Sequence, residues 1–187
     1  MSARKQAVFD AIDAANKQDP NLEDSQPAEL LYGQRMSAEL DRLFPGASET
    51  LQIAARGQHV ERWKLARSEY PDGRAGYLAW RKAQGVHHAE VVAEMMTQAG
   101  YSAEEAESAS RMLRKQGIKR HDDVQALEDV ICFVFLKWYF APFAKKHSAE
   151  KIQRIVEKTA RKMSADGRAR VLAEFDLPDQ LAAAFQD

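Results

Sequence analysis

The apolar stretch Val130–Ala144 constrains the fold of this chain more than any other feature, because Lys137 alone interrupts it. Its residues VICFVFLKWYF are β-branched and aromatic, as in a strand. With VQALED in front, however, the run is too long for a typical strand, and its apolar positions cover every face of a helix. A helix that is apolar all round is buried among other helices. A membrane span needs about 20 residues. The stretch therefore predicts a buried central helix near residues 122–140.

The rest of the chain shows helical spacing between a few widely separated turn signals, and no repeats or strict alternation. Pro27 suits the first turn of a helix, and Ser102 with Glu105 forms a capping box. Helices are predicted from Pro27, from Ser48 to about Leu65, from Arg74 to Ala99 with a break at Gly85, from Ser102 to near Gly117, and from Ser148 to about Met163. We therefore expect an all-α protein with one compact domain over residues 1–187, in which residues 165–187 form a C-terminal helical extension.

Charge and cysteine content exclude several classes of protein. The 187 residues carry 27 Lys and Arg against 28 Asp and Glu, a formal net charge of −1. No bulk field therefore draws the chain to nucleic acid or to a membrane, and any anion site must be a local cluster. The single cysteine, Cys132, excludes an intrachain disulfide and any multi-cysteine metal site. The first 20 residues lack the apolar core of a secretory signal, so a cytoplasmic location is expected.

Histidines on apolar helix faces are the first candidates for function. His88 leads a stripe that is otherwise apolar, whereas its neighbour His87 aligns with Glu90 and Glu94. We therefore expect His88 to be buried and His87 to face solvent. His59 lies in LQIAARGQHVERW, three residues after Arg56.

Two adjacent carboxylates, Glu128 and Asp129, begin the most apolar helix, where a buried charge is costly unless it is compensated. One hypothesis is that His59, His88 and Asp129 converge on one divalent metal ion, since imidazole and carboxylate ligands suit zinc, manganese or iron. The alternative is structural. In that case Arg56 pairs with Asp129 or Glu128, and the histidines bond to buried carbonyls.

The segment of residues 62–81, RWKLARSEYPDGRAGYLAWR, is rich in arginines and large aromatic residues. Guanidinium groups suit phosphate, and aromatic faces suit a base or a sugar. Its candidate substrate-binding residues are Arg62, Trp63, Arg67, Tyr70, Arg74, Tyr77 and Trp80. An equally good interpretation is a loop whose aromatic residues pack on the core. A second basic cluster around Arg114 and Lys115 is attributed to a helix end, where basic residues are favoured.

Several longer motifs carry a resemblance to a known family. Gln58-His59, GYLAWR, His88-Ala89-Glu90, LEDVICFVFL and KTARKMS resemble domain-of-unknown-function family 4202 over nearly the whole chain. This resemblance by itself implies no activity.

A looser resemblance connects the helices around His59, His88 and Asp129 to the HD-superfamily phosphohydrolases. It implies an HD-like helical fold in which these three residues hold a divalent metal. Val60 stands where the family has the aspartate of its His-Asp pair, and Lys115 lies near the position of a further histidine. The resemblance therefore supports at most a mononuclear site, and a degenerate, non-catalytic domain fits the same residues.

Two functions remain open. The first is a metal-dependent phosphohydrolase acting on a small phosphorylated molecule or nucleotide. Glu128 would orient a ligand or act as the base, and Arg56 would help to hold the anion. The second is a metal-free helical module that binds a nucleotide, RNA or a protein partner through residues 62–81.

Overall fold

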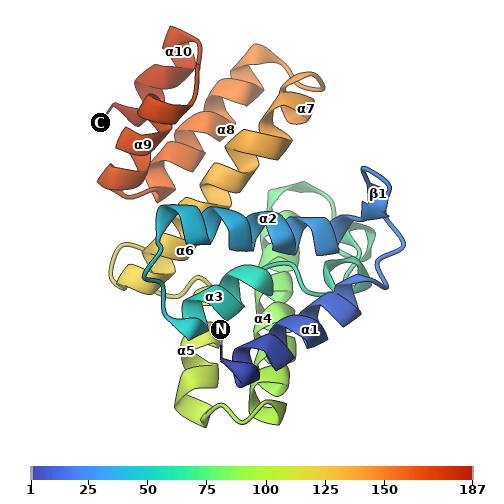
Figure 1. The fold of residues 1–187 in the computed structure, drawn as a ribbon. Helices are drawn as coiled ribbons and strands as arrows, with labels where there is room; N and C mark the ends of the chain where they lie inside the picture. The colour runs from blue at the N-terminus through green and yellow to red at the C-terminus, as the bar shows by residue number, and fades with distance from the viewer. Residues whose placement is uncertain (1, 187) are drawn as a thin grey trace. The chain divides into compact units, whose positions relative to one another are not determined.

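The computed structural model describes residues 2–186, and within them helices account for nearly all regular structure. The all-α prediction is confirmed. Contacts divide the chain into two compact units, Met1–Gln116 and Gly117–Asp187, which we call the N-terminal and C-terminal units. Residues 165–187, the predicted C-terminal extension, belong to the C-terminal unit. Figure 1 shows the helices of each unit.

The N-terminal unit contains five α-helices, two short 3₁₀ turns and a very small hairpin. Leu22 pairs with Pro27, and Glu23 pairs with Gln26. The elements are α1 (Ala3–Asn16), β1 (Leu22–Glu23), β2 (Gln26–Pro27), α2 (Ala28–Leu43), α3 (Glu49–Arg56), η1 (Arg62–Lys64), η2 (Arg67–Glu69), α4 (Gly73–Gln98) and α5 (Ala103–Leu113).

Two predicted helix starts of this unit are confirmed by side-chain caps. The Ser48 hydroxyl accepts a hydrogen bond from the Leu51 amide at the start of α3. At the start of α5, Ser102 and Glu105 bond reciprocally to each other's backbone amides, which satisfies two amides that lack a partner within the helix.

Two predicted helix boundaries in this unit are wrong. The helix that begins after Ser48 ends at Arg56 rather than near Leu65. The chain then turns, and Glu61 adopts a left-handed backbone with φ of 52°. The other helix, α4, continues through Gly85 without a break. A Cβ atom on Gly85 would lie 3.2 Å from the carbonyl oxygen of Leu113, so this glycine allows α4 and α5 to approach closely.

The C-terminal unit begins with the predicted central helix. Its elements are α6 (Asp122–Val134), η3 (Phe135–Tyr139), α7 (Phe140–Ala144), α8 (Ala149–Lys162), α9 (Ala165–Glu174), α10 (Asp179–Ala182) and η4 (Ala183–Phe185). The run α6–η3–α7 is helical throughout, but η3 is a π-helical turn. Pro142 has no amide hydrogen to donate to the carbonyl four residues earlier, that of Trp138. The regular α-helical bonding is therefore interrupted in the turn before it.

Burial agrees with the prediction for this central helix. Val130, Phe133 and Val134 are at most 1% exposed. Cys132 is also buried. Ser148 caps α8 as predicted, by accepting a hydrogen bond from the Lys151 amide.

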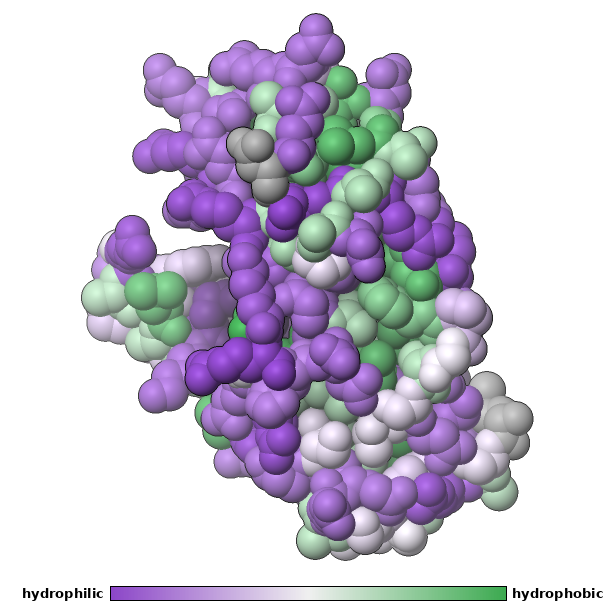
Figure 2. Space-filling model, turned by 90° about the vertical axis from the view of Figure 1, so that its left-hand side faces the viewer, coloured by the Kyte–Doolittle hydropathy of each residue, from purple (hydrophilic) through white to green (hydrophobic). Residues whose placement is uncertain are grey.

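The surface carries few large apolar side chains. In the described part of the chain these are Leu22, Tyr77, Leu78, Val86 and Leu172. On the face drawn in Figure 2, hydrophilic side chains cover most of the surface and apolar atoms show between them. None of the described helices combines the length and the apolar character that crossing a bilayer requires.

Gly76, in the first turns of α4, should not tolerate a side chain. A Cβ atom there would lie 1.8 Å from the carbonyl oxygen of Pro71, and backbone cannot move aside cheaply. We expect Gly76→Ala to lower the free energy of unfolding by about 3 kcal/mol, at the upper end of overpacking costs, as measured by urea denaturation. At Gly46 nothing lies within 4 Å of such an atom. Gly46→Ala is therefore the control, and equal stability of the two variants would contradict the prediction.

Candidate binding pocket

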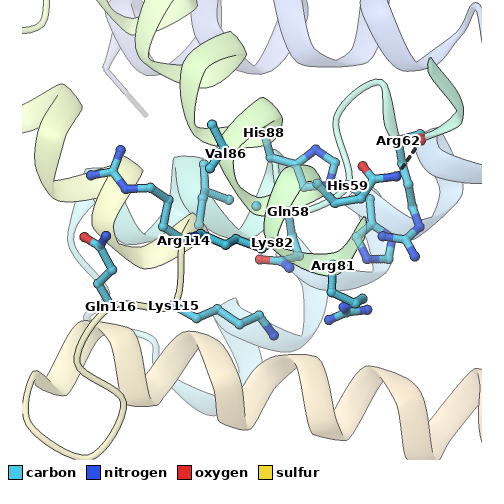
Figure 3. Close-up of a pocket in the computed structure, with 13 residues that line it drawn as sticks. Gln58, His59, Arg62, Arg81, Lys82, Val86, His88, Arg114, Lys115 and Gln116 are labelled. Atoms are coloured by element: carbon cyan, nitrogen blue, oxygen red, sulfur yellow. Dashed lines mark hydrogen bonds between the residues drawn. The ribbon is translucent and has the colours of Figure 1, made fainter. Parts of the chain in front are cut away.

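A cavity of about 300 Å³ lies within the N-terminal unit (Figure 3). Its walls come from the turn after α3, from η1, from the middle of α4 and from the end of α5. The lining residues are Gln58, His59, Arg62, Arg81, Lys82, Gln84, Gly85, Val86, His88, Leu113, Arg114, Lys115 and Gln116.

Positive charge dominates this pocket. Three arginines and two lysines line it, and no acidic side chain of the described residues does. Two of the arginines have acidic neighbours outside the lining. Arg62 Nε lies 3.7 Å from Glu29 Oε1, and Arg114 Nη2 lies 2.6 Å from Glu107 Oε1. Burial lowers the pKa of Arg62, the nearby carboxylate of Glu29 opposes this, and repulsion from Arg81 lowers the pKa further. The cations therefore repel one another in the absence of an anion.

His59 is held by a carboxylate and a stacked ring. Its Nδ1 lies 3.0 Å from Glu29 Oε2, and its ring stacks on Tyr32 with centroids 3.8 Å apart. Burial lowers the pKa of His59 well below its usual value, and the charges of Arg62 and other cations add to this. Burial raises the pKa of Glu29 to about 7. His59 is therefore neutral. When Glu29 is ionised, the Nδ1–H group donates to it and Nε2 carries a lone pair.

His88 is oriented by the backbone. It is 2% exposed, which confirms its predicted burial, and Nδ1 lies 2.8 Å from the carbonyl oxygen of Val60. A carbonyl only accepts, so Nδ1 carries the hydrogen and the neutral ring keeps its lone pair on Nε2. That nitrogen is buried and has no hydrogen-bond partner among the described residues. Burial and then the neighbouring His59 lower the pKa of His88 well below its usual value. The two rings lie 6.0 Å apart.

Like His88 Nε2, two glutamine side-chain oxygens of the pocket are buried acceptors without a hydrogen-bond partner among the described residues. Gln84 donates through Nε2 to the carbonyl oxygens of Arg62 and Leu65, at 2.9 and 3.0 Å. These bonds fix the amide so that Oε1 is the free end. Within residues 2–186, Oε1 of Gln84 and Oε1 of Gln58 are buried without a hydrogen-bond partner. The pocket thus combines cations with three unsatisfied acceptors.

The predicted arginine and aromatic segment contributes only Arg62 of its candidate residues to the pocket. Trp80 packs against Arg62, whose guanidinium lies 4.7 Å from the centre of the indole ring. Trp80 Nε1 donates a hydrogen bond to the carbonyl oxygen of Leu65, which holds the indole in place. The other candidates of this segment do not line the pocket. They are Trp63, Arg67, Tyr70, Arg74 and Tyr77. Arg67 Nη1 donates to the carbonyl oxygen of Tyr70, and Arg74 and Tyr77 are exposed.

Arg56 is engaged elsewhere in the N-terminal unit. Its Nε and Nη2 donate to the two carboxylate oxygens of Asp13, at 2.7 and 2.6 Å. The guanidinium therefore holds α3 to α1 through a bidentate pair. Arg56 does not line the pocket. The structural interpretation expected Arg56 to pair with Asp129 or Glu128, and this is wrong, because Arg56 pairs with Asp13.

Asp129 belongs to the C-terminal unit, where it anchors the start of α9. Its oxygens accept hydrogen bonds from the amide and hydroxyl of Ser164, at 2.8 and 2.5 Å, and from Gln125 Nε2 at 3.0 Å. A Cβ atom on Gly167 would lie 2.9 Å from the carboxyl carbon of Asp129, so the glycine makes room for it. Burial raises the pKa of Asp129, although these hydrogen bonds oppose it. The neighbouring Glu128 lies 3.4 Å from Lys162 Nζ.

The predicted metal ligands are thus only partly brought together. His59 and His88 share the pocket, but both oxygens of Asp129 are used within its own unit. Across residues 2–186, no group of three or more histidine, cysteine or acidic side chains is placed to hold a metal ion. The predicted divalent metal, and the catalytic role of Glu128, stay predictions.

Sequence reasoning missed several residues of the pocket. Lys82 and Gln84 stood out in no motif, and Gln58 was noted only beside His59. Arg114 and Lys115 were attributed to a helix end, yet both line the pocket. No sequence pattern marked Lys115, which the structure places just past α5 with φ of 57°. The helix has already ended there, so its dipole is a weaker reason for a basic residue.

The chain is thus a small helical protein with a basic pocket in its N-terminal unit. The family model of a domain of unknown function, DUF4202, matches residues 6–184, and the chain belongs to this family. No curated protein and no solved structure matches the chain.

The buried state of His88 predicts a loss of stability in mild acid. An unfolded histidine with a pKa of about 6.5 takes up a proton below that pH, whereas folded His88 stays neutral. Glu29 and His59 together make no difference to the number of bound protons in this pH range. The folded pair holds one proton on Glu29, and the unfolded pair holds one on His59. One excess proton on the unfolded chain lowers the free energy of unfolding by about 1.4 kcal/mol per pH unit as the pH falls below 6.5.

Urea denaturation between pH 6.5 and 5.5 measures this slope. The variant His88→Asn keeps a donor for the Val60 carbonyl and cannot titrate, so we expect the slope to disappear in it. His147→Asn, at a half-buried position in the C-terminal unit, is the control. An unchanged slope in His88→Asn would contradict the prediction.

Proposed function

We propose that the protein binds a small phosphate-bearing molecule in the basic pocket of its N-terminal unit. The observation that carries this proposal is the lining itself: five cationic side chains and no acidic one of the described residues surround about 300 Å³. Guanidinium groups bind phosphate oxygens through paired, charge-assisted hydrogen bonds. A dianion would also relieve the repulsion between Arg62 and Arg81.

The grouping of the cations around one pocket and the charge of the whole chain favour a small ligand over a nucleic acid. A nucleic-acid surface needs a basic stripe that follows the backbone over many phosphates. Here the cations surround one cavity, and the chain as a whole has a net charge of −1.

Calorimetric titration with inorganic phosphate tests the proposal. We expect one saturable site per chain whose affinity falls as the salt concentration rises, because the interaction is mainly electrostatic. Sulfate should compete with phosphate. The absence of saturable binding up to phosphate concentrations on the order of 10 mM, a range that still detects contacts of about 3 kcal/mol, would overturn the proposal.

Hydrolysis of the bound phosphoester is a second candidate function, and the arrangement of His59 favours it. A neutral imidazole held at Nδ1 by a carboxylate presents Nε2 as a general base. Nε2 would take a proton from a water molecule as its oxygen attacks phosphorus. The ester P–O bond then breaks, and the same proton passes to the leaving oxygen. The surrounding cations would stabilise the charge on the phosphoryl oxygens.

Phosphate release from a panel of phosphomonoesters tests this second function. The assay is run with chelator and also with added zinc, manganese or iron(II), which covers the predicted metal-dependent form. Loss of turnover in His59→Gln, together with an altered pH profile in Glu29→Gln, would support it. No release under any condition, or release that does not depend on His59, would leave the pocket as a binding site only.

A further inference from the structure

We infer that the ligand of this pocket is a phosphorylated polyol, whose hydroxyl groups donate hydrogen bonds to Gln58 Oε1, Gln84 Oε1 and His88 Nε2. This inference rests on the proposed function, and it adds the chemistry of the part of the ligand that carries the phosphate. The three atoms are buried acceptors without a partner in the described chain, and their residues line the same cavity as the cations. In Figure 3 the side chains of Gln58 and His88 lie among the basic ones.

Two of the three acceptors cannot turn away to find another partner. The backbone carbonyl of Val60 holds Nδ1 of His88, so Nε2 of that ring is fixed as an acceptor. The carbonyls of Arg62 and Leu65 hold Nε2 of Gln84, which fixes Oε1 in the same way. The turn after α3 and η1 therefore pre-organise both acceptors. Buried acceptors are usually satisfied in folded proteins, and hydroxyl groups of a molecule in the pocket would supply the donors that these two acceptors lack among the described residues.

The charge of the pocket determines which donors fit. An ammonium group would bring a positive charge among five cations, at a Coulombic cost that a partly buried site increases. A hydroxyl group donates without charge. The lining residues with apolar side chains are Val86 and Leu113. A molecule with one phosphate and several hydroxyl groups therefore matches the site, whereas a phosphate on a bare hydrocarbon chain leaves the three acceptors unsatisfied.

The size of the cavity limits the ligand. About 300 Å³ is at the lower end of small-molecule sites. The space suits a phosphate with a short polyol or one sugar ring attached, and a dinucleotide is too large for it.

Competitive titrations with matched probes test the inference. The polyol probes are ribose 5-phosphate, glucose 6-phosphate and glycerol 3-phosphate, and the controls are pentyl, hexyl and propyl phosphate, which have the same carbon numbers and charge but no hydroxyl groups. We expect at least one polyol phosphate to bind about tenfold more tightly than its alkyl control, as two or three added hydrogen bonds would give.

Variants locate the hydroxyl contacts. Gln58→Met preserves length and breaks no hydrogen bond of the described side chains, and it should weaken binding of the preferred polyol phosphate about fivefold. Binding of the alkyl control, which has no hydroxyl group to lose a hydrogen bond, should weaken less than binding of the polyol phosphate. Gln153→Met is the control, because Gln153 Oε1 is also buried without a hydrogen-bond partner among residues 2–186, but Gln153 belongs to the C-terminal unit and does not line the pocket.

Each outcome separates the inference from the proposed function. If polyol and alkyl phosphates bind equally well, the site takes phosphate and the inference is wrong. Tighter binding of every alkyl phosphate would show that water satisfies the three acceptors, and it would also overturn the inference. If no phosphate compound binds, the proposed function itself fails. An equal loss of polyol phosphate binding in Gln58→Met and Gln153→Met would show that the effect is not local to the pocket.

Discussion

Replacing Arg81 with alanine should weaken phosphate binding about 10- to 100-fold. One hydrogen-bonded interaction with a charged group contributes about 1.5–3 kcal/mol, and each 1.4 kcal/mol corresponds to tenfold in affinity. Arg81 is the most informative cation, because no hydrogen bond or ion pair joins it to another described residue. Its removal should therefore leave the folded structure intact. Calorimetric titration of inorganic phosphate into wild type and variant measures the change.

Arg74→Ala is the control for this experiment. Arg74 belongs to the same helix and to the predicted arginine and aromatic segment, but it is exposed and does not line the pocket. We expect its substitution to change phosphate affinity less than twofold, an effect of distant charge that salt screens. If Arg74→Ala weakens binding as much as Arg81→Ala does, the segment of residues 62–81 is the binding surface, as first predicted, and the pocket is not.

Replacing Asp129 with alanine should lower the free energy of unfolding by about 3 kcal/mol. The substitution leaves the amide and hydroxyl of Ser164 without their acceptor, and a hydrogen bond to a charged group contributes about 1.5–3 kcal/mol. It also removes a negative charge from the N-terminus of α9, where the helix dipole favours one. Chemical denaturation followed by circular dichroism measures the loss.

Asp166→Ala is the matched control, since Asp166 is an exposed carboxylate in the first turn of the same helix. It should cost less than about 1 kcal/mol, the usual contribution of a surface charge at a helix N-terminus. The structural role of Asp129 also predicts that phosphate binding survives in Asp129→Ala under conditions where the variant is folded. Unchanged stability together with lost metal binding would instead support the metal-ligand hypothesis for Asp129.

Local patterns predicted much of the fold because they act within a few residues. The serine caps at Ser48, Ser102 and Ser148 each bond to the amide three residues later, as the sequence spacing implies. Burial of His88 followed from its place in an apolar stripe. The break predicted at Gly85 was wrong because the role of this glycine depends on a residue far away in the sequence. A glycine within a helix can mark a break or a close contact, and the contact with Leu113 lies 28 residues further along the chain.

The pocket was harder to predict, because its residues come together from separate elements. Asp129 was correctly expected to need compensation, but its partner, Ser164, begins a helix 35 residues later. Lys82 and Gln84 face the cavity from the middle of α4, where no local pattern distinguishes them from solvated residues. The position of Arg114 and Lys115 at a helix end was by itself enough to explain why these residues are basic. Their second role depends on where α4 and η1 lie in space.

Because Arg62 stacks on Trp80, the intrinsic fluorescence of this tryptophan can report on the state of the pocket. The guanidinium lies over the indole at 4.7 Å, and the indole nitrogen is tied to the carbonyl of Leu65. An anion that attracts Arg62 must change the charge next to this fluorophore. Occupancy of the pocket can therefore be followed through intrinsic emission, without a label and at low protein concentration. Trp80→Phe identifies which part of the signal comes from this site.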